Sequence, residues 1–278
     1  MTFETWQAGD ITLYLGDCLE VLPTLEAGSI DLTVTSPPYD NLRTYDGYTF
    51  NFEGIAQELY RVTKPGGVVV WVVGDATIDG SETGTSFKQA LYFKEIGFNL
   101  HDTMIYATDK PPNNSSRYQS CFEFMFIFSN GKPKVFNPIM ELVSSCSATV
   151  ERKKYKSHAA YQRNTTGEYS GKRRDFTKTK KVKNNIWWIY SAFGANDKLS
   201  ASHPAVFPEA LARDHILSWS NPGDTILDPM MGSGTTGKMA INFQRKFIGS
   251  DCSSKYFEIA KKRIAQAQLQ MHLPLDIP

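Results

Sequence analysis

The sequence predicts an α/β fold in which helices cover both faces of a mostly parallel sheet. Apolar stretches of strand length alternate with stretches of helical spacing over the first 110 residues, and the alternation returns after residue 208. Turns rich in glycine and proline separate many of these stretches. Parallel strands need crossover connections that are usually helices, so this alternation favours a parallel sheet.

Residues 52–62 show the helical pattern clearly. Their apolar side chains recur at helical spacing, and Lys64-Pro65-Gly66-Gly67 ends the stretch. Residues 68–73 then form a continuous apolar run, which suits a buried strand. The same reasoning gives the other elements of this part. The expected strands are residues 11–15, 30–35, 68–73 and 100–107, and the expected helices are residues 18–25, 52–62 and 87–96.

A hairpin signal and a change of composition follow. Residues 122–128 and 134–136 flank Ser129-Asn130-Gly131. Because Asn-Gly favours a tight antiparallel turn, we expect an antiparallel hairpin at the sheet edge. Residues 137–200 are polar, basic and aperiodic, and we interpret them as an inserted lobe. The chain thus divides into 1–136, the insert 137–200, and 201–278, with the two outer segments forming one domain.

Regular patterning resumes at Pro208, since proline suits the first position of a helix. The expected elements are a helix from 208 to about 219, a strand at 225–227, a helix at 235–243, a strand at 246–250 and an amphipathic helix at 254–268.

The composition narrows the class of protein. Hydrophobic residues make up 41% of the chain and charged residues 21%, which is typical of a globular protein. No apolar run approaches the roughly 20 residues of a membrane span, and the amino terminus has no signal pattern, so we expect a cytoplasmic protein without membrane contact. The cysteines at 18, 121, 146 and 252 lack metal-ligand spacing, and we expect neither a metal nor a disulfide.

The charge is distributed unevenly along the chain. Residues 152–183 contain twelve Lys and Arg residues against two acids, Glu168 and Asp175, although the whole chain carries a net charge of +1. A basic segment in an otherwise acidic protein is typical of a lobe that faces a polyanion such as nucleic acid. For any single Lys or Arg, a solvated surface role is the simpler reading.

The segment TILDPMMGSGTTGKMA, residues 225–240, places a strand, an acid, a Gly-x-Gly turn and a helix in succession. Gly232 and Gly234 allow the backbone to pass close to a ligand, and the helix start offers unpaired amides. Asp251 ends the next strand, where a carboxylate can accept both hydroxyls of a ribose. This pattern predicts a nucleotide-cofactor loop. A structural glycine turn, with Asp228 and Asp251 as strand-end caps, is the alternative.

A phosphate-binding loop is a weaker reading of the same residues. Residues 232–238 satisfy GxxxxGK, but Met239 stands where a Ser or Thr hydroxyl would bind magnesium.

The stretch Ser36-Pro37-Pro38-Tyr39 follows the strand at 30–35 directly, so it lies at the carboxyl end of a parallel strand, where ligands bind in open α/β sheets. The prolines fix their φ angles and lack amide hydrogens, which lets the carbonyls of Ser36 and Pro37 point into a cleft. A planar heterocycle with an amino group suits this site, because hydroxyl and carbonyl accept its hydrogens while the ring stacks on Tyr39. A rigid tight turn is the alternative reading of these four residues alone.

The TSPPY loop, the LDPMMGSGTT loop and their order resemble the amino-methyltransferases of DNA restriction-modification systems, in the permuted class where the catalytic motif comes first. The resemblance covers nearly the whole chain outside the basic insert. It implies a Rossmann-like class I methyltransferase sheet. Asp251 stands where the family more often has Glu. The resemblance assigns catalysis to Ser36, Pro37, Pro38 and Tyr39, and cofactor binding to Asp17, Phe207, Asp228, Pro229, Met230, Gly232, Ser233, Gly234, Thr235 and Asp251.

The resemblance implies S-adenosylmethionine as cofactor, double-stranded DNA as substrate, and methylation of a base flipped out of the duplex. It further implies a bacterial or phage-encoded, nucleoid-associated protein, and it allows a cognate restriction endonuclease and a homodimer as partners. The insert falls where the family places target recognition. The expected DNA-binding residues are Arg152, Lys153, Lys154, Lys172, Arg173, Arg174, Lys180 and Lys181.

Two alternatives concern the reaction and its target. Carbon-5 cytosine methylation needs a nucleophilic Cys that usually follows Pro, whereas each Cys here follows Asp or Ser, which excludes that reaction. The resemblance favours the 4-amino group of cytosine as target, because Ser, as at position 36, is associated in this family more often with cytosine; the 6-amino group of adenine stays open. A non-catalytic DNA-binding protein is a more remote alternative, which would not need Asp228, Asp251 or the paired glycines.

Overall fold

The computed structural model describes residues 3–38, 50–108, 118–142, 161–163, 169–173, 180–189 and 207–271, with only the backbone for 161–163, 169–173 and 271. The chain forms two compact units. The first comprises residues 1–137 and 185–278, and the second comprises Pro138–Asn184. The second unit ends before Ser200, the expected end of the insert, because residues 186–188 pair with the sheet of the first unit.

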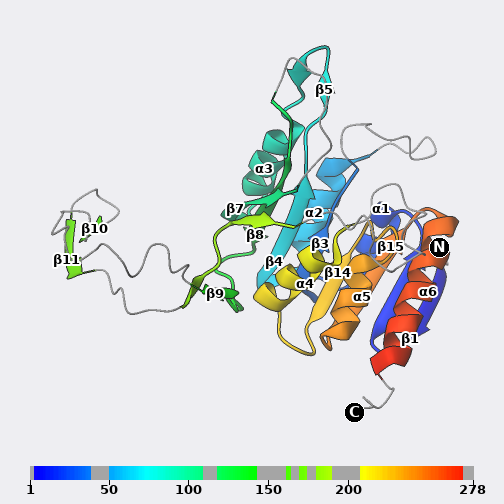
Figure 1. Ribbon diagram of the computed structural model, residues 1–278. Helices are drawn as coiled ribbons and strands as arrows, with labels where there is room; N and C mark the ends of the chain where they lie inside the picture. Colours follow the sequence, from blue (N-terminus) through cyan, green and yellow to red (C-terminus); the bar gives the residue numbers. More distant parts are fainter. Residues whose placement is uncertain are drawn as a thin grey trace. The chain divides into compact units, whose positions relative to one another are not determined.

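A nine-stranded sheet forms the centre of the first unit (Figure 1). Five adjacent strands in its middle, β2-β15-β14-β3-β4, run parallel. This agrees with the expected mostly parallel sheet. In spatial order the strands are β1 (Glu4–Ala8), β2 (Ile11–Leu15), β15 (Lys246–Asp251), β14 (Thr225–Asp228), β3 (Ile30–Thr35), β4 (Thr63–Val73), β8 (Phe122–Ser129), β7 (Asn99–Ala107) and β13 (Ile186–Trp188).

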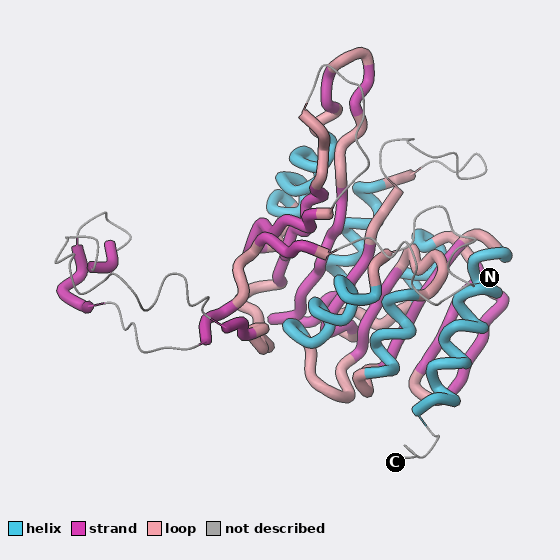
Figure 2. The backbone as a smooth tube through the Cα atoms, viewed as in Figure 1, coloured by secondary structure: helices cyan, strands magenta, loops and turns pink. Residues whose placement is uncertain are grey.

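Helices lie on both faces of this sheet (Figure 2). The carboxyl-terminal helices α4, α5 and α6 pack side by side on one face, whereas α2 and α3 cover the other (Figure 1). The helices are α1 (Cys18–Val21), α2 (Phe52–Val62), α3 (Thr85–Glu95), α4 (Glu209–Trp219), α5 (Thr235–Asn242) and α6 (Ser254–Met271), with a short 3-10 turn η1 (Leu22–Thr24) after α1.

The two halves of the chain interleave in the sheet. Strand β14, from the carboxyl-terminal part, pairs with β3 from the amino-terminal part through Ile226 and Leu32. A sheet assembled in this way brings the end of β3 beside the end of β14. The pairing of β3 with β14 thus places the SPPY loop and the glycine loop next to each other in space, although they are far apart along the chain.

An aromatic core fixes the α2–α3 face. The Phe93 ring of α3 stacks on Phe128 of β8 with centroids 4.4 Å apart. Trp71 is fully buried, and its indole N–H donates to the Gln89 side chain at 2.8 Å, so its polar atom is satisfied. Each such buried aromatic side chain stabilises the fold by roughly 1.5–3 kcal/mol.

The expected hairpin of residues 122–128 with 134–136 is wrong. Strand β8 pairs instead with β4 and β7, antiparallel to both, and residues 134–136 form no strand. Because β8 is apolar on both faces, it suits the sheet interior better than the edge. After Asn130 the chain turns back on β4, where Lys134 N–H donates to the Gly66 carbonyl at 3.0 Å.

An antiparallel hairpin does form an edge of the sheet, but from other residues. Strands β1 and β2 pair from Glu4 opposite Leu15 to Ala8 opposite Ile11, and Gly9, with φ of +59°, turns the chain between them. The sequence predicts no strand at 4–8, because apolar alternation there is weak.

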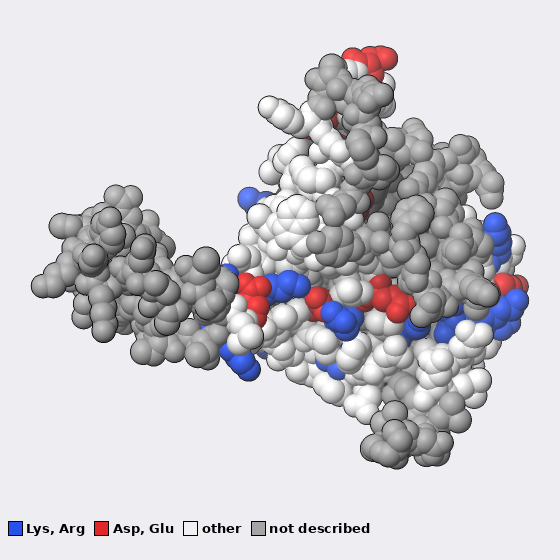
Figure 3. Space-filling model, in the orientation of Figure 1, with Lys and Arg blue, Asp and Glu red and all other residues white. Residues whose placement is uncertain are grey.

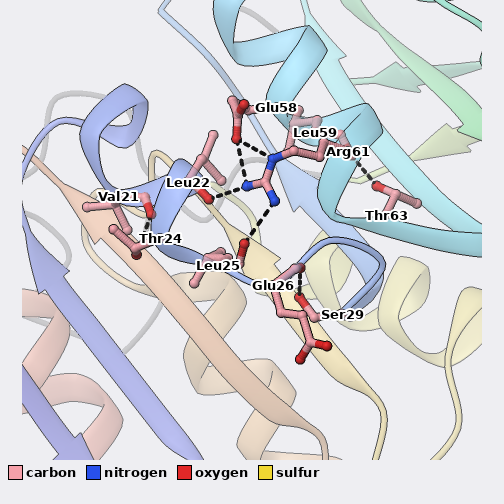
Figure 4. A network of polar contacts seen from close by, with 10 residues as sticks. All are labelled: Val21, Leu22, Thr24, Leu25, Glu26, Ser29, Glu58, Leu59, Arg61 and Thr63. Carbon is pink, nitrogen blue, oxygen red and sulfur yellow. Dashed lines mark hydrogen bonds and ion pairs between the residues drawn. The ribbon is translucent and has the colours of Figure 1, made fainter.

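Arg61 of α2 anchors the chain that follows β2 (Figure 4). Its guanidinium donates to the carbonyls of Leu22 at 2.7 Å and Leu25 at 2.9 Å, and it also pairs with Glu58 at 2.7 Å. These contacts fix η1, which directly follows α1, against α2.

The second unit contains two short antiparallel ladders. Strand β9 (Met140–Leu142) pairs with β12 (Lys180–Val182), and β10 (Tyr161–Arg163) pairs with β11 (Tyr169–Arg173). Within the part of the chain that the structure describes, no helix is long and apolar enough to cross a membrane.

Candidate functional site

The carboxyl ends of the five parallel strands form one edge of the sheet, and the expected site residues gather there. β15 ends at Asp251 and β14 at Asp228, while Thr35 ends β3. The Gly16 N–H, just after β2, donates to the Asp251 carbonyl at 3.0 Å. Strand pairing thus brings three predicted motifs, far apart in sequence, to one edge.

A direct hydrogen bond joins the strand that leads into the SPPY loop to the acid of the glycine loop. The Thr35 hydroxyl donates to Asp228 Oδ1 at 2.8 Å, and both residues are buried. A second contact runs the other way, because the Thr236 hydroxyl donates to the Val34 carbonyl at 3.4 Å. These two hydrogen bonds fix the start of the SPPY loop relative to the glycine loop.

Burial raises the pKa of Asp228 from 3.8 to about 6. The Thr35 hydroxyl and the Met230 N–H, which donates at 3.2 Å, favour the charged form and oppose the shift. The charge of Asp251 adds to it. An acid held among neutral donors in this way costs free energy of folding, as functional sites often do.

Burial also raises the pKa of Asp251 to about 6. The Gly232 N–H donates to its Oδ2 at 3.0 Å and the Ser253 N–H to its Oδ1 at 2.8 Å. Asp251 thus holds the glycine loop in place. Each oxygen keeps a second lone pair for another donor.

The glycine loop requires glycine at two positions. Gly232 and Gly234 have φ of +50° and +76°, in the left-handed region that side chains disfavour. A Cβ on Gly234 would lie 2.8 Å from the Ala260 Cβ of α6. The sequence predicts that both glycines admit a ligand, with a structural turn as the alternative, and the structure shows that Gly234 is needed for the close approach of α6.

The SPPY loop begins directly after β3. Pro37 is buried, and Ser36 and Pro38 are partly exposed. Tyr39 lies outside the described residues. The loop therefore leaves the sheet at the edge where Asp228 and Asp251 end their strands.

Two further cofactor candidates occupy the starts of helices. Asp17 caps α1, since its Oδ1 accepts the Leu19 N–H at 2.9 Å. Phe207 is partly exposed and directly precedes Pro208, the cap residue of α4. Pro208 lies one position before the helix rather than at its first residue.

Asp75, which was not among the predicted site residues, follows β4 at the same edge. Its carboxylate accepts the Ser86 N–H at 2.8 Å and the Thr83 hydroxyl at 3.3 Å, and it thereby fixes the start of α3. The signal was present, because Gly74-Asp75 follows an apolar strand as Gly16-Asp17 does.

Between Asp75 and α3 the chain forms a small hairpin of β5 (Thr77–Ile78) and β6 (Ser81–Glu82). Figure 3 shows acidic side chains at its tip, and Asp79 and Glu82 are exposed. Such a tip disfavours contact with phosphates.

The expected DNA-binding residues belong to the second unit. Lys180 and Lys181 are exposed on β12, and Lys181 forms an ion pair with Glu141 at 2.9 Å. The backbones of Lys172 and Arg173 lie in β11. The remaining expected residues, Arg152, Lys153, Lys154 and Arg174, lie outside the described residues.

Comparison with known proteins agrees with these motifs. A family model described as DNA methylase, of the N6 and N4 type, matches residues 30–262. The chain is 52% identical over 255 residues to the orphan methyltransferase M.BamHII of Bacillus amyloliquefaciens, covering 90% of each. It is 29% identical over 265 residues to the DNA adenine methyltransferase YhdJ of Escherichia coli K12, covering 91% of this chain and 82% of that protein.

Solved structures show the same fold. PvuII DNA methyltransferase (cytosine-N4-specific) aligns with a TM-score of 0.68 at 19% identity, over 100% of this chain and 92% of that one. The M1.HpyAVI–SAM complex aligns with a TM-score of 0.59 at 24% identity, over 91% and 98%. The expected Rossmann-like methyltransferase fold is confirmed. Since the family model spans most of the chain and M.BamHII is identical at half of the aligned positions, the chain belongs to the N6/N4 DNA methylase family.

Proposed function

We propose that this DNA methylase transfers a methyl group from S-adenosylmethionine to the exocyclic amino group of a flipped base, with the cytosine 4-amino group as the favoured target. The observation that carries the proposal is the Thr35–Asp228 hydrogen bond of 2.8 Å. It ties the strand of the amine-binding loop to the acid of the cofactor loop, so that donor and acceptor can meet at one edge of the sheet.

The described residues fit S-adenosylmethionine. Both Asp251 oxygens keep acceptor capacity for ribose hydroxyls, and Gly232 exposes backbone without a side chain. Asp17 would contact the adenine, and Phe207 would pack on the cofactor. The methionine part would be held by the loop from Asp228 through Pro229, Met230 and Ser233 to Thr235. The complex of M1.HpyAVI with SAM shows that this fold accommodates the cofactor in a structural neighbour.

When bound, the cofactor supplies an electrophilic methyl group on sulfur. The task of the SPPY loop is to prepare the nitrogen that receives it. The Ser36 hydroxyl and the Pro37 carbonyl would accept the two amino hydrogens out of the ring plane, which favours a pyramidal nitrogen with its lone pair toward the methyl group. Tyr39 would stack on the base. The product nitrogen is acidic, so no strong base is assigned.

The choice of base rests on Ser36. A serine at the first position of the loop favours cytosine, and PvuII methyltransferase is named as cytosine-N4-specific. Adenine is the alternative, since YhdJ is named as an adenine methyltransferase.

The basic second unit is the proposed DNA contact. Lys180 and Lys181 are exposed on one strand, although Lys181 shares its charge with Glu141. We assign them, with the basic residues of 152–174, to phosphate contacts that position the duplex. The similarity to an orphan methyltransferase of Bacillus amyloliquefaciens supports a bacterial protein without a cognate endonuclease.

The test is to methylate duplex DNA with the protein and methyl-labelled S-adenosylmethionine, and to digest the product to nucleosides for mass spectrometry. Labelled N4-methylcytosine is the expected product. Labelled N6-methyladenine would overturn the choice of base, and labelled 5-methylcytosine or no label would overturn the proposed function.

A further inference from the structure

We infer that Arg263 of α6, together with Glu209 of α4, is a positioning residue for the cofactor site: it holds the glycine loop and the start of α4 in the arrangement that binds S-adenosylmethionine. The inference rests on the proposed function. Arg263 lies outside the motifs that predict the site, and Glu209 lies two residues after Phe207 with no predicted role of its own.

The guanidinium of Arg263 reaches the glycine loop from α6. The side chain is only 1% exposed. Nη1 donates to the Ser233 carbonyl, to the Ser233 hydroxyl at 3.0 Å and to the Thr235 hydroxyl at 3.1 Å. These two residues flank Gly234, whose φ is +76°. Arg263 therefore holds the chain on both sides of the left-handed residue on which the shape of the loop depends.

The other end of the guanidinium binds α4. Nη2 of Arg263 lies 3.2 Å from Glu209 Oε1, and the Lys238 ammonium of α5 binds the same oxygen at 2.7 Å. Glu209 is the first residue of α4, two positions after Phe207. The Glu209 carboxylate of α4 thus binds both α5, through Lys238, and α6, through Arg263. It thereby fixes the start of α4 close to Phe207, the proposed cofactor-packing residue.

This use of an arginine points to positioning more than to packing. A buried charge costs free energy of folding, and an apolar side chain of similar size often stabilises a core as well or better. What an apolar residue cannot supply is a planar group that donates to the Ser233 and Thr235 oxygens through Nη1 and to the Glu209 carboxylate through Nη2. Arg263 thus places its charged group on the glycine loop, whose geometry sets the affinity for the cofactor.

Arg245 provides a matched control. It too is buried, at 7% exposure, and its Nε and Nη2 donate to the Ser220 hydroxyl at 3.0 Å and the Ser220 carbonyl at 2.6 Å. It directly precedes Lys246, where β15 begins, so it lies at the amino edge of the sheet, opposite the site.

The experiment compares the R263M and R245M variants of the full chain. For each, calorimetric titration gives the Kd for S-adenosylmethionine, thermal melting gives stability, and kinetics give KM and kcat on duplex DNA. We expect R263M to raise Kd and the cofactor KM about ten-fold or more, with kcat at saturating cofactor within about three-fold of wild type. R245M should lower the melting temperature comparably and leave Kd within about two-fold.

Two milder variants keep the test decisive if R263M does not fold. R263K retains the charge but not the planar set of donors, and E209Q retains the shape but not the charge that Arg263 and Lys238 share. Both should raise the cofactor KM more than they change kcat. Folded R263K and E209Q proteins with unchanged Kd, or equal Kd changes in R263M and R245M, would overturn the inference. If wild-type protein neither binds the cofactor nor methylates DNA, the proposed function fails instead.

Discussion

The carboxylates at the two edges of the parallel sheet have different kinds of partner. At the amino edge, Asp31 is paired, because the Lys64 ammonium lies 2.7 Å from its Oδ2, which also accepts the Thr225 N–H at 2.9 Å. At the carboxyl edge, the hydrogen bonds that Asp228 and Asp251 accept come from neutral hydroxyl and backbone donors, and burial raises the pKa of both. At the amino edge, the ion pair of Asp31 with Lys64 stabilises the fold. At the carboxyl edge, burial of Asp228 and Asp251 lowers stability but keeps their oxygens available as acceptors.

The largest expected loss of stability comes from adding a side chain in the tightly packed glycine loop. Gly234→Ala adds a Cβ 2.8 Å from Ala260 and imposes a disfavoured φ, so it should lower the free energy of unfolding by about 4 kcal/mol. Gly223→Ala, at the amino edge, has φ of +88° but no atom within 4 Å of the new Cβ, and should cost only about 1 kcal/mol. Chemical denaturation measures both. Equal losses would contradict the packing account of Gly234.

A change of pH should move stability and cofactor affinity in opposite directions. Because burial raises the pKa of Asp228 and Asp251 to about 6 from 3.8, the folded protein binds protons more tightly than the unfolded chain. Their contribution to the free energy of unfolding therefore rises as pH falls through 6, is complete below 3.8, and is lost above 6. For Asp228 it amounts to roughly 2–3 kcal/mol.

The affinity for S-adenosylmethionine should fall over the same range, since a protonated Asp251 accepts ribose hydroxyls less well. Denaturation and cofactor titration at pH 7.5 and 5.5 test this, with Asp251→Asn as the control. A pH-independent affinity in the wild type would contradict the role of the Asp251 carboxylate.

At the amino edge, loss of a charged side chain should change stability only modestly and leave the cofactor site unchanged. Asp31→Ala removes the acceptor of the Lys64 ammonium and of the Thr225 N–H, and should lower the free energy of unfolding by about 1–2 kcal/mol. The Kd for the cofactor should stay at the wild-type value, as titration of the folded variant can show. A rise in Kd comparable to that of a carboxyl-edge variant would erase the distinction between the two edges.

The sequence predicts the centre of the fold well for a physical reason. Buried strands such as β3 and β4 are apolar runs, and amphipathic helices such as α2 carry periodic apolar faces, so burial leaves a local signal. The edge strand β1 escaped prediction because its apolar alternation is weak, and β13 escaped it because it has only three residues. Trp187 of β13 is buried by stacking on His215 of α4, a distant contact that no local pattern encodes.

The site residues likewise fall into those that leave a local signal in the sequence and those that do not. The strand-end acids Asp228 and Asp251 could be found from spacing, because the chemistry needs them at fixed distances from the glycines. Asp75 also leaves a local signal, since Gly74-Asp75 follows an apolar strand as Gly16-Asp17 does. Arg263 and Glu209 could not be assigned, because their partners come together only through the packing of the helices on the sheet. The expected hairpin at Asn130 failed for a related reason, since the choice of strand partner is decided by the whole sheet.

The central claim is that the carboxyl edge holds one methyl-transfer site with separate subsites for base and cofactor. Measuring cofactor Kd and kcat for Tyr39→Ala and Gly232→Val tests it most directly. Tyr39→Ala should lower kcat about 100-fold with Kd nearly unchanged, whereas Gly232→Val should raise Kd far more than it lowers kcat at saturating cofactor. Equal loss of cofactor binding in both variants would contradict the account.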